Sequence, residues 1–131
     1  MKIVNIYRNI NGTEMKSIDI SLILKHIKNG RWQTQVNEIR DLINRNENEK
    51  ASVLKKTLPA FTPSGTFNER RKKENIDSYS GLLHLDYDKV ENVEILKETI
   101  IKIPYTYSAF ISPSGKGLKV IVNTDAKLKS H

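Results

Sequence analysis

The segment Leu82-Leu-His-Leu-Asp-Tyr-Asp88 decides how the second half of the chain is expected to fold. Successive side chains of a strand point to opposite faces of a sheet. The alternation separates an apolar set from a polar set: Leu83, Leu85 and Tyr87 against His84, Asp86 and Asp88. We therefore expect a strand over residues 80–88 whose apolar face lies under a helix and whose polar face stays open.

The residues that follow supply that helix and two more strands. Residues 90–103 form an amphipathic pattern that ends at Pro104. The apolar side of this helix consists of Val93, Leu96, Ile100 and Ile103. Strands are predicted over 105–111 and 118–123, and the small residues of 112–117 predict a hairpin turn between them. The second half is therefore expected to be a β-α-β-β unit.

The first half of the chain predicts a strand, three helices, and a strand with a turn. Their expected ranges are 2–10, 17 or 19 to 29, 33–44, 47–57 and 60–67. Ser17 or Asp19 caps the first helix, and Gly30 stops it. We expect one α+β domain over 1–131, with a strand and helices in 1–58 and the β-α-β-β unit in 59–131. The last strand lacks the helix and strand that usually complete such a unit, which predicts either a short protein or one piece of a longer one.

The composition narrows the class of protein. The chain has 131 residues, which suits one domain, and no cysteine, which excludes disulfides and thiolate zinc sites. No apolar run approaches the roughly 20 residues of a membrane helix, and the N-terminus lacks a signal-peptide core, so we expect a cytoplasmic protein without membrane contact. Its 22 basic and 15 acidic residues give a net charge of +7, which favours polyanionic partners.

Asp86 and Asp88 form a candidate metal site. Two residues apart on one strand face, their Cα atoms lie roughly 6–7 Å from each other, so both carboxylates can reach one divalent cation or bridge two. Lys119, from the strand after the turn, is expected on the same open face. The alternative is a pair of solvated acids at a strand end, paired to Lys89 or Lys119.

Two further segments carry candidate phosphate contacts, each with a plainer alternative. The turn 112–117 is either a flexible hairpin connection or a phosphate-binding loop, because backbone N–H groups approach closely there and Lys116 adds charge. It is not a Walker A loop, since Gly117 and Leu118 follow the lysine. The charged run 69–74 is either a solvated loop or a nucleic-acid contact. Its basic residues are Arg70, Arg71, Lys72 and Lys73.

Three blocks of sequence together resemble a known family. They are 58–67 (LPAFTPSGTF), 79–88 (YSGLLHLDYD) and 110–122 (FISPSGKGLKVIV). In this order and spacing they resemble the VirE-type N-terminal domain of Bacteroidetes mobile-element and phage-related proteins, often followed by a helicase-like ATPase. That domain is similar to the archaeo-eukaryotic primase superfamily, which includes primase–polymerases. The resemblance implies an RRM-like palm with helices on one face of its sheet.

The resemblance also implies roles for individual residues. Asp86 and Asp88 correspond to the acidic motif that holds Mg²⁺ or Mn²⁺ for catalysis. The motif that contacts the incoming nucleotide corresponds to Ser112, Ser114, Gly115, Lys116, Gly117 and Lys119. Two departures stand out: Lys119 takes the place of a histidine, and the later acidic motif has no counterpart before His131.

Three hypotheses follow. The first is a primase–polymerase-like domain of mobile-element or phage DNA replication, which joins nucleoside triphosphates on a DNA or RNA template with Mg²⁺ or Mn²⁺. The second is a non-catalytic nucleotide- or nucleic-acid-binding module that accompanies a helicase-like ATPase. The third is a plain α+β interaction domain.

Overall fold

The computed structural model of the chain describes residues 2–9, 12, 14–67 and 76–124. Within these ranges the chain forms four helices and eight strands, and all strand pairs are antiparallel. This confirms the predicted α+β class. The chain divides into two compact units, Met1–Ser80 and Gly81–His131. In the parts of the chain that the structure describes, no helix has the length and apolar character needed to cross a membrane.

The first unit is built around β1 (Ile3–Tyr7), the central strand of a sheet with the order β2-β1-β3. Its neighbours are β2 (Met15–Asp19) and β3 (Ala60–Thr62), and a separate ribbon pairs β4 (Gly65–Phe67) with β5 (Ile76–Tyr79). Because β3 pairs with β1, the segment after residue 58 contributes to this unit, which extends to Ser80.

The buried side chain of Asn5 ties these strands together. Its amide nitrogen lies 3.4 Å from the Ser17 hydroxyl of β2, and its amide oxygen accepts a 2.7 Å hydrogen bond from the Phe67 backbone N–H of β4. Its own backbone N–H donates to the Thr62 hydroxyl of β3. Asn5 thus contacts three other strands, and these contacts satisfy its own polar groups, as burial requires.

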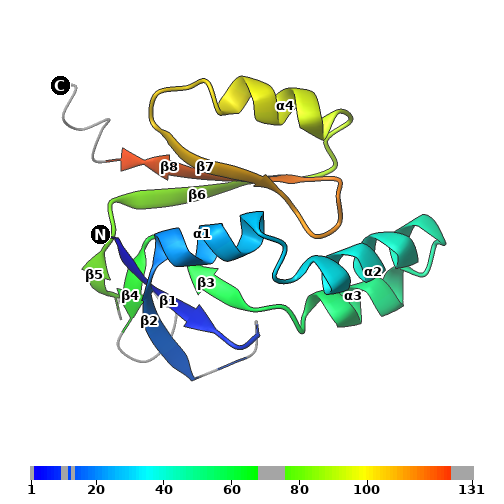
Figure 1. Cartoon of the computed structure of the whole chain (residues 1–131), viewed down its shortest axis with the longest axis horizontal. Helices are drawn as coiled ribbons and strands as arrows, with labels where there is room; N and C mark the ends of the chain where they lie inside the picture. Colours follow the sequence, from blue (N-terminus) through cyan, green and yellow to red (C-terminus); the bar gives the residue numbers. More distant parts are fainter. Residues whose placement is uncertain (1, 10–11, 13, 68–75, 125–131) are drawn as a thin grey trace. The chain divides into compact units, whose positions relative to one another are not determined.

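Three helices complete the first unit: α1 (Ile20–Lys28), α2 (Gln33–Asn44) and α3 (Asn48–Lys55). The Asp19 side chain caps α1 by accepting from the Ser21 backbone N–H at 3.0 Å, one of the two caps that the sequence predicts. Helices α2 and α3 lie side by side (Figure 1). Their shared core consists of Ile39, Leu42 and Ala51, with Ile43, Leu54 and Leu58 packed against it.

The second unit is the predicted β-α-β-β unit. It consists of β6 (Leu82–Tyr87), α4 (Val93–Ile100), β7 (Thr106–Ile111) and β8 (Leu118–Asn123). The sheet has the order β6-β8-β7. Since β6 and β7 are both antiparallel to β8, they run parallel to each other with β8 inserted between them, which is a split β-α-β arrangement. Figure 1 shows α4 on one face of this sheet.

Helix α4 covers only part of that face. Val93, Leu96 and Ile100 pack on the β7–β8 part of the sheet, against residues such as Leu118 and Val120. The apolar residues of β6 share this face by register but remain half exposed, which corrects the prediction that the helix covers them. Their exposed fractions are 54% for Leu83, 46% for Leu85 and 41% for Tyr87. The helix packs on β7 and β8, whereas β6 is an edge strand of the sheet. The helix is also shorter than predicted, 93–100 instead of 90–103.

Candidate functional site

Asp86 and Lys119 are direct cross-strand neighbours on the face opposite α4. Antiparallel pairing of β6 with β8 sets them side by side, and the lysine Nζ lies 3.3 Å from Asp86 Oδ1. His84 Nε2 lies 3.6 Å from the other carboxylate oxygen, Oδ2. The prediction that Lys119 shares the face of Asp86 is confirmed. The ion pair is open to water, because the two side chains are 38% and 41% exposed.

Asp88 lies directly after the end of β6, where the chain turns sharply. The next residue, Lys89, has φ +52, a left-handed conformation that L-residues adopt rarely and that ends the strand. Asp88 is exposed, and Gly117 lies close to it. A Cβ atom on Gly117 would be 2.6 Å from the Tyr87 carbonyl oxygen and 3.6 Å from Asp88 Oδ1. Only a glycine therefore lets the β7–β8 turn approach the end of β6 this closely.

The turn between β7 and β8 is held by its own hydrogen bonds. The buried Ser112 hydroxyl accepts from the Gly117 N–H at 3.1 Å, and the Ser114 hydroxyl accepts from the Lys116 N–H at 3.2 Å. The Gly115 N–H donates to the Ser112 carbonyl. Three backbone N–H groups that a phosphate-binding loop would present are thus engaged inside the turn. Because these N–H groups are already hydrogen-bonded, a ligand at this turn would be bound by its side chains rather than by its backbone.

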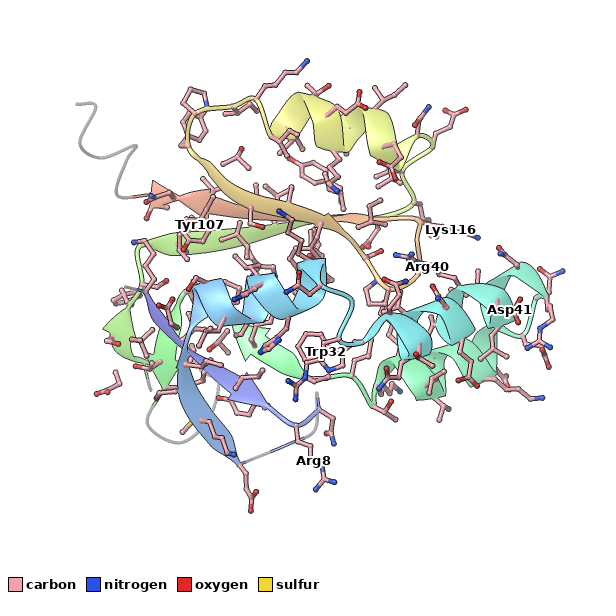
Figure 2. All side chains as sticks on the ribbon, in the orientation of Figure 1. Arg8, Trp32, Arg40, Asp41, Tyr107 and Lys116 are labelled. Atoms are coloured by element: carbon pink, nitrogen blue, oxygen red, sulfur yellow. The ribbon has the colours of Figure 1, made fainter. Side chains whose placement is uncertain are left out.

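Lys116 is the basic side chain of this support. Figure 2 shows it at the turn between β7 and β8, where it is exposed. Its backbone carbonyl accepts a 2.7 Å hydrogen bond from the Val90 N–H, which fastens the turn to the chain just beyond β6. Two lysines, Lys116 and Lys119, therefore lie with the two aspartates at one end of one sheet.

The oxygen ligands available here suit a divalent cation only in part. Asp86 and Asp88 provide two carboxylates, and in the described ranges no three histidine or acidic side chains gather into a metal-binding group. Mg²⁺ is commonly held by one or two protein carboxylates while water and substrate phosphates complete its shell. The donor set fits a cation that arrives together with a phosphate ligand better than a permanently bound one.

The structure describes some of the predicted site residues but not others, and it adds one residue that was not predicted. The basic residues Arg70 to Lys73 lie outside the described residues. His84, by contrast, was given no role by the sequence analysis although it contacts the Asp86 carboxylate. The strand alternation had already placed His84 on the polar face, so that pattern was a usable signal.

Fold and geometry define a small α+β domain with an acidic–basic cluster at one end of an antiparallel sheet. The chain belongs to the family described as "BT4734-like, N-terminal domain", whose model matches residues 53–131, more than half of the chain. The match spans all three sequence blocks that carry the resemblance, and the description names no activity. No curated protein and no solved structure matches the chain.

Proposed function

We propose that this protein is a nucleotide-binding domain of the primase–polymerase type. In this proposal it takes a nucleoside triphosphate together with Mg²⁺ or Mn²⁺ and acts with a DNA or RNA template in mobile-element or phage DNA replication in the cytoplasm. The ligand site is the Asp86/Asp88 end of the β6–β8–β7 sheet. The VirE-type and primase resemblance of the sequence motivates the class, and the geometry of the site supports the ligand.

The observation that carries the proposal is the approach of Gly117 to the end of β6. It brings the β7–β8 turn to within contact distance of the Tyr87 carbonyl, next to Asp88. Acidic groups that suit a cation and basic groups that suit phosphate therefore converge at one place. A metal–triphosphate complex carries both kinds of charge and needs both kinds of partner.

Each residue has a distinct task in this proposal. Asp86 and Asp88 supply carboxylate oxygens to the cation, whose charge neutralises the triphosphate when it is bound. Lys119 leaves its ion pair with Asp86 and pairs with a phosphate oxygen instead. Lys116 provides a second positive charge from the turn. Ser112 and Ser114 hold the turn in shape through their hydroxyl groups.

Thermal unfolding with and without ligand tests the site. A ligand that binds only the folded state stabilises it by linkage, by about 2.7 kcal/mol at 100 times its Kd. Because the proposed site binds the cation through two carboxylates, Asp86 and Asp88, we expect Mn²⁺ alone to raise Tm slightly and Mn²⁺ with a nucleoside triphosphate to raise it clearly. The Asp86→Asn/Asp88→Asn variant should lose the combined shift.

The matched control is Asp41→Asn/Asp77→Asn, which removes the same charge from exposed positions in the first unit. This control should keep the full shift. An undiminished shift in the Asp86→Asn/Asp88→Asn variant would overturn the site assignment.

A second candidate function is a non-catalytic module that binds nucleotide or nucleic acid beside a helicase-like ATPase. The Asp86–Lys119 ion pair and the lack of a third acidic ligand in the described ranges favour it. Primer extension separates the two. Extension by the protein that is lost in Asp86→Asn/Asp88→Asn supports the polymerase, whereas nucleotide binding without any extension supports the module.

A further inference from the structure

The connection between α1 and α2 carries a basic and aromatic cluster that the proposed nucleotide site does not use. It consists of Lys25, His26, Lys28, Arg31 and Trp32, here called the α1–α2 corner. Trp32 lies at this connection in Figure 2. The corner belongs to the first unit and lies outside the residues that the family model matches.

The local backbone folds Arg31 back over the end of α1. Gly30, at φ +79, donates its N–H to the Ile27 carbonyl, and the Arg31 N–H donates to the His26 carbonyl at 3.0 Å. These two bonds and the left-handed glycine form a Schellman motif, the common way to end a helix. The motif fixes the direction in which the chain leaves the helix, and it brings Arg31 beside His26.

The aromatic part of the corner is ordered by ring contacts. The Arg31 guanidinium carbon lies 5.8 Å from the centroid of the Trp32 ring, within cation–π range. The His26 ring meets the same indole edge-on, with centroids 6.3 Å apart. Trp32 is half-buried whereas Arg31 is exposed, so the indole supports the guanidinium and the guanidinium faces solvent.

The basic residues of the corner lie in a stretch of sequence without acidic residues. Residues 20–37 contain no aspartate or glutamate. Lys25 and Lys28 are exposed and three residues apart, hence on one side of α1. Within the described part of the chain, no salt bridge engages Lys25, Lys28 or Arg31. These side chains combine positive charge with the planar Arg31 guanidinium, which the Trp32 ring supports. Such a surface suits an anionic ligand that also carries a flat group able to stack.

We infer that the α1–α2 corner binds single-stranded nucleic acid. An unpaired base stacks on the exposed Arg31 guanidinium, which Trp32 holds in place, since bases stack on arginine planes as well as on aromatic rings. Lys25 and Lys28 pair with the flanking phosphates. A duplex hides its base faces, so the corner prefers a single strand. The sugar does not enter this contact, and oligothymidylate and oligouridylate are expected to bind alike.

Titration of the intact protein with fluorescent oligothymidylate tests this inference. Trp32 is the only tryptophan of the chain, so its emission reports on the corner directly and should change as the oligonucleotide binds. Arg31→Ala should weaken binding about tenfold, the size expected for loss of one stacked base. Lys25→Gln/Lys28→Gln should reduce the slope of log affinity against log salt by about 1.4, or about 0.7 for each phosphate that a lysine no longer neutralises.

The control for charge is Lys55→Gln/Lys56→Gln, which removes two exposed lysines from the end of α3 in the same unit. This control should bind almost as the wild type does. The inference is overturned if both corner variants bind with unchanged affinity and salt slope. Heparin, a polyanion without bases, provides a second test. If Arg31 stacks on a base, Arg31→Ala should lose more affinity for oligothymidylate than for heparin. Equal losses for the two ligands would also overturn the inference.

This inference is independent of the proposed nucleotide site. Asp86→Asn/Asp88→Asn should bind oligothymidylate like the wild type, because none of the corner residues belongs to that site. A failure of nucleotide binding and a failure of the corner are therefore distinguished by the same set of variants.

Discussion

Asp86 and Lys119 form an ion pair between the neighbouring strands β6 and β8, with 3.3 Å between the carboxylate oxygen Oδ1 and the lysine Nζ. A ligand that uses both must replace this ion pair. The replacement costs little, because an exposed ion pair contributes only about 0–1 kcal/mol to stability. A cation on Asp86 and a phosphate on Lys119 would leave each charge with an opposite partner. The pair is thus compatible with a ligand site and does not require one.

Lys119→Met separates the structural from the binding role of the lysine. We expect the free energy of unfolding to fall by less than about 1 kcal/mol, since the pair is exposed. The Tm increase caused by Mn²⁺ and nucleoside triphosphate should nevertheless largely disappear. Denaturant titration and thermal unfolding measure the two effects. A large loss of stability with an intact ligand shift would contradict the proposed role.

Gly117→Ala tests the close approach of the turn to β6. Its Cβ would lie 2.6 Å from the Tyr87 carbonyl oxygen, so the turn must move away from Asp88. We expect a loss of about 1–3 kcal/mol in unfolding free energy, as for overpacking in general, together with a weaker nucleotide response. Chemical denaturation and thermal shift assays measure both quantities.

Gly30→Ala is the control for Gly117→Ala. Its φ of +79 makes an alanine unfavourable by about 1–2 kcal/mol, but the position lies in the first unit. It should lose stability and keep the nucleotide response. Equal loss of the response in both variants would mean that instability alone explains it.

For single residues, the sequence could predict which face of the sheet a side chain lies on, but not which atoms it contacts. The shared face of Asp86 and Lys119 follows from strand alternation, which is a local property. The Gly117–Tyr87 approach and the internal bonds of Ser112 and Ser114 depend on how β7, β8 and β6 meet, and no local pattern encodes that. The same holds for the Arg31–Trp32 contact.

At the scale of elements, the sequence predicted those helices and strands whose own residues show a helical or strand pattern. Helix α2 spans Gln33–Asn44 as its apolar spacing predicts. Strand β2 was missed, because Met15–Asp19 has little strand character of its own and is stabilised by pairing with β1, as in Val4 opposite Ile18. Strand β5 was missed for the same reason, since its partner is β4.

The start of α3 provides a prediction on pH. The hydrogen bond from Lys50, that lysine's charge and the charge of Arg45 lower the pKa of Glu47 below its ordinary value of 4.5. Because the pKa of Glu47 is lower in the folded state than in the unfolded state, its carboxylate stabilises the fold at pH values above the ordinary pKa. This stabilisation is lost as the pH falls through the lowered pKa of the folded state. Glu47→Gln should therefore be slightly less stable than the wild type at neutral pH and equally stable in strong acid. Thermal unfolding of both across this range measures the difference. A difference that persists in strong acid would contradict it.

At the scale of the whole molecule, the excess of positive charge lies mainly in the first compact unit, which has 15 basic and 9 acidic residues against 7 and 6 in the second. The family model matches residues 53–131 and so includes all of the second unit but only part of the first. The sequence could predict the second unit almost completely, because a β-α-β-β pattern is continuous along the chain. It could not predict the boundary at Ser80, which depends on β3 returning to pair with β1.

The two units allow a prediction about how the two proposed ligands combine. The nucleotide site draws its residues from the second unit, and the α1–α2 corner draws its residues from the first. Lys25→Gln/Lys28→Gln should therefore keep the Tm shift with Mn²⁺ and nucleoside triphosphate while it loses oligothymidylate affinity. Asp86→Asn/Asp88→Asn should show the opposite pattern, and the combined variant should lose both responses. If either pair of substitutions alone abolishes both responses, one shared surface binds both ligands, and the assignment of separate sites is wrong.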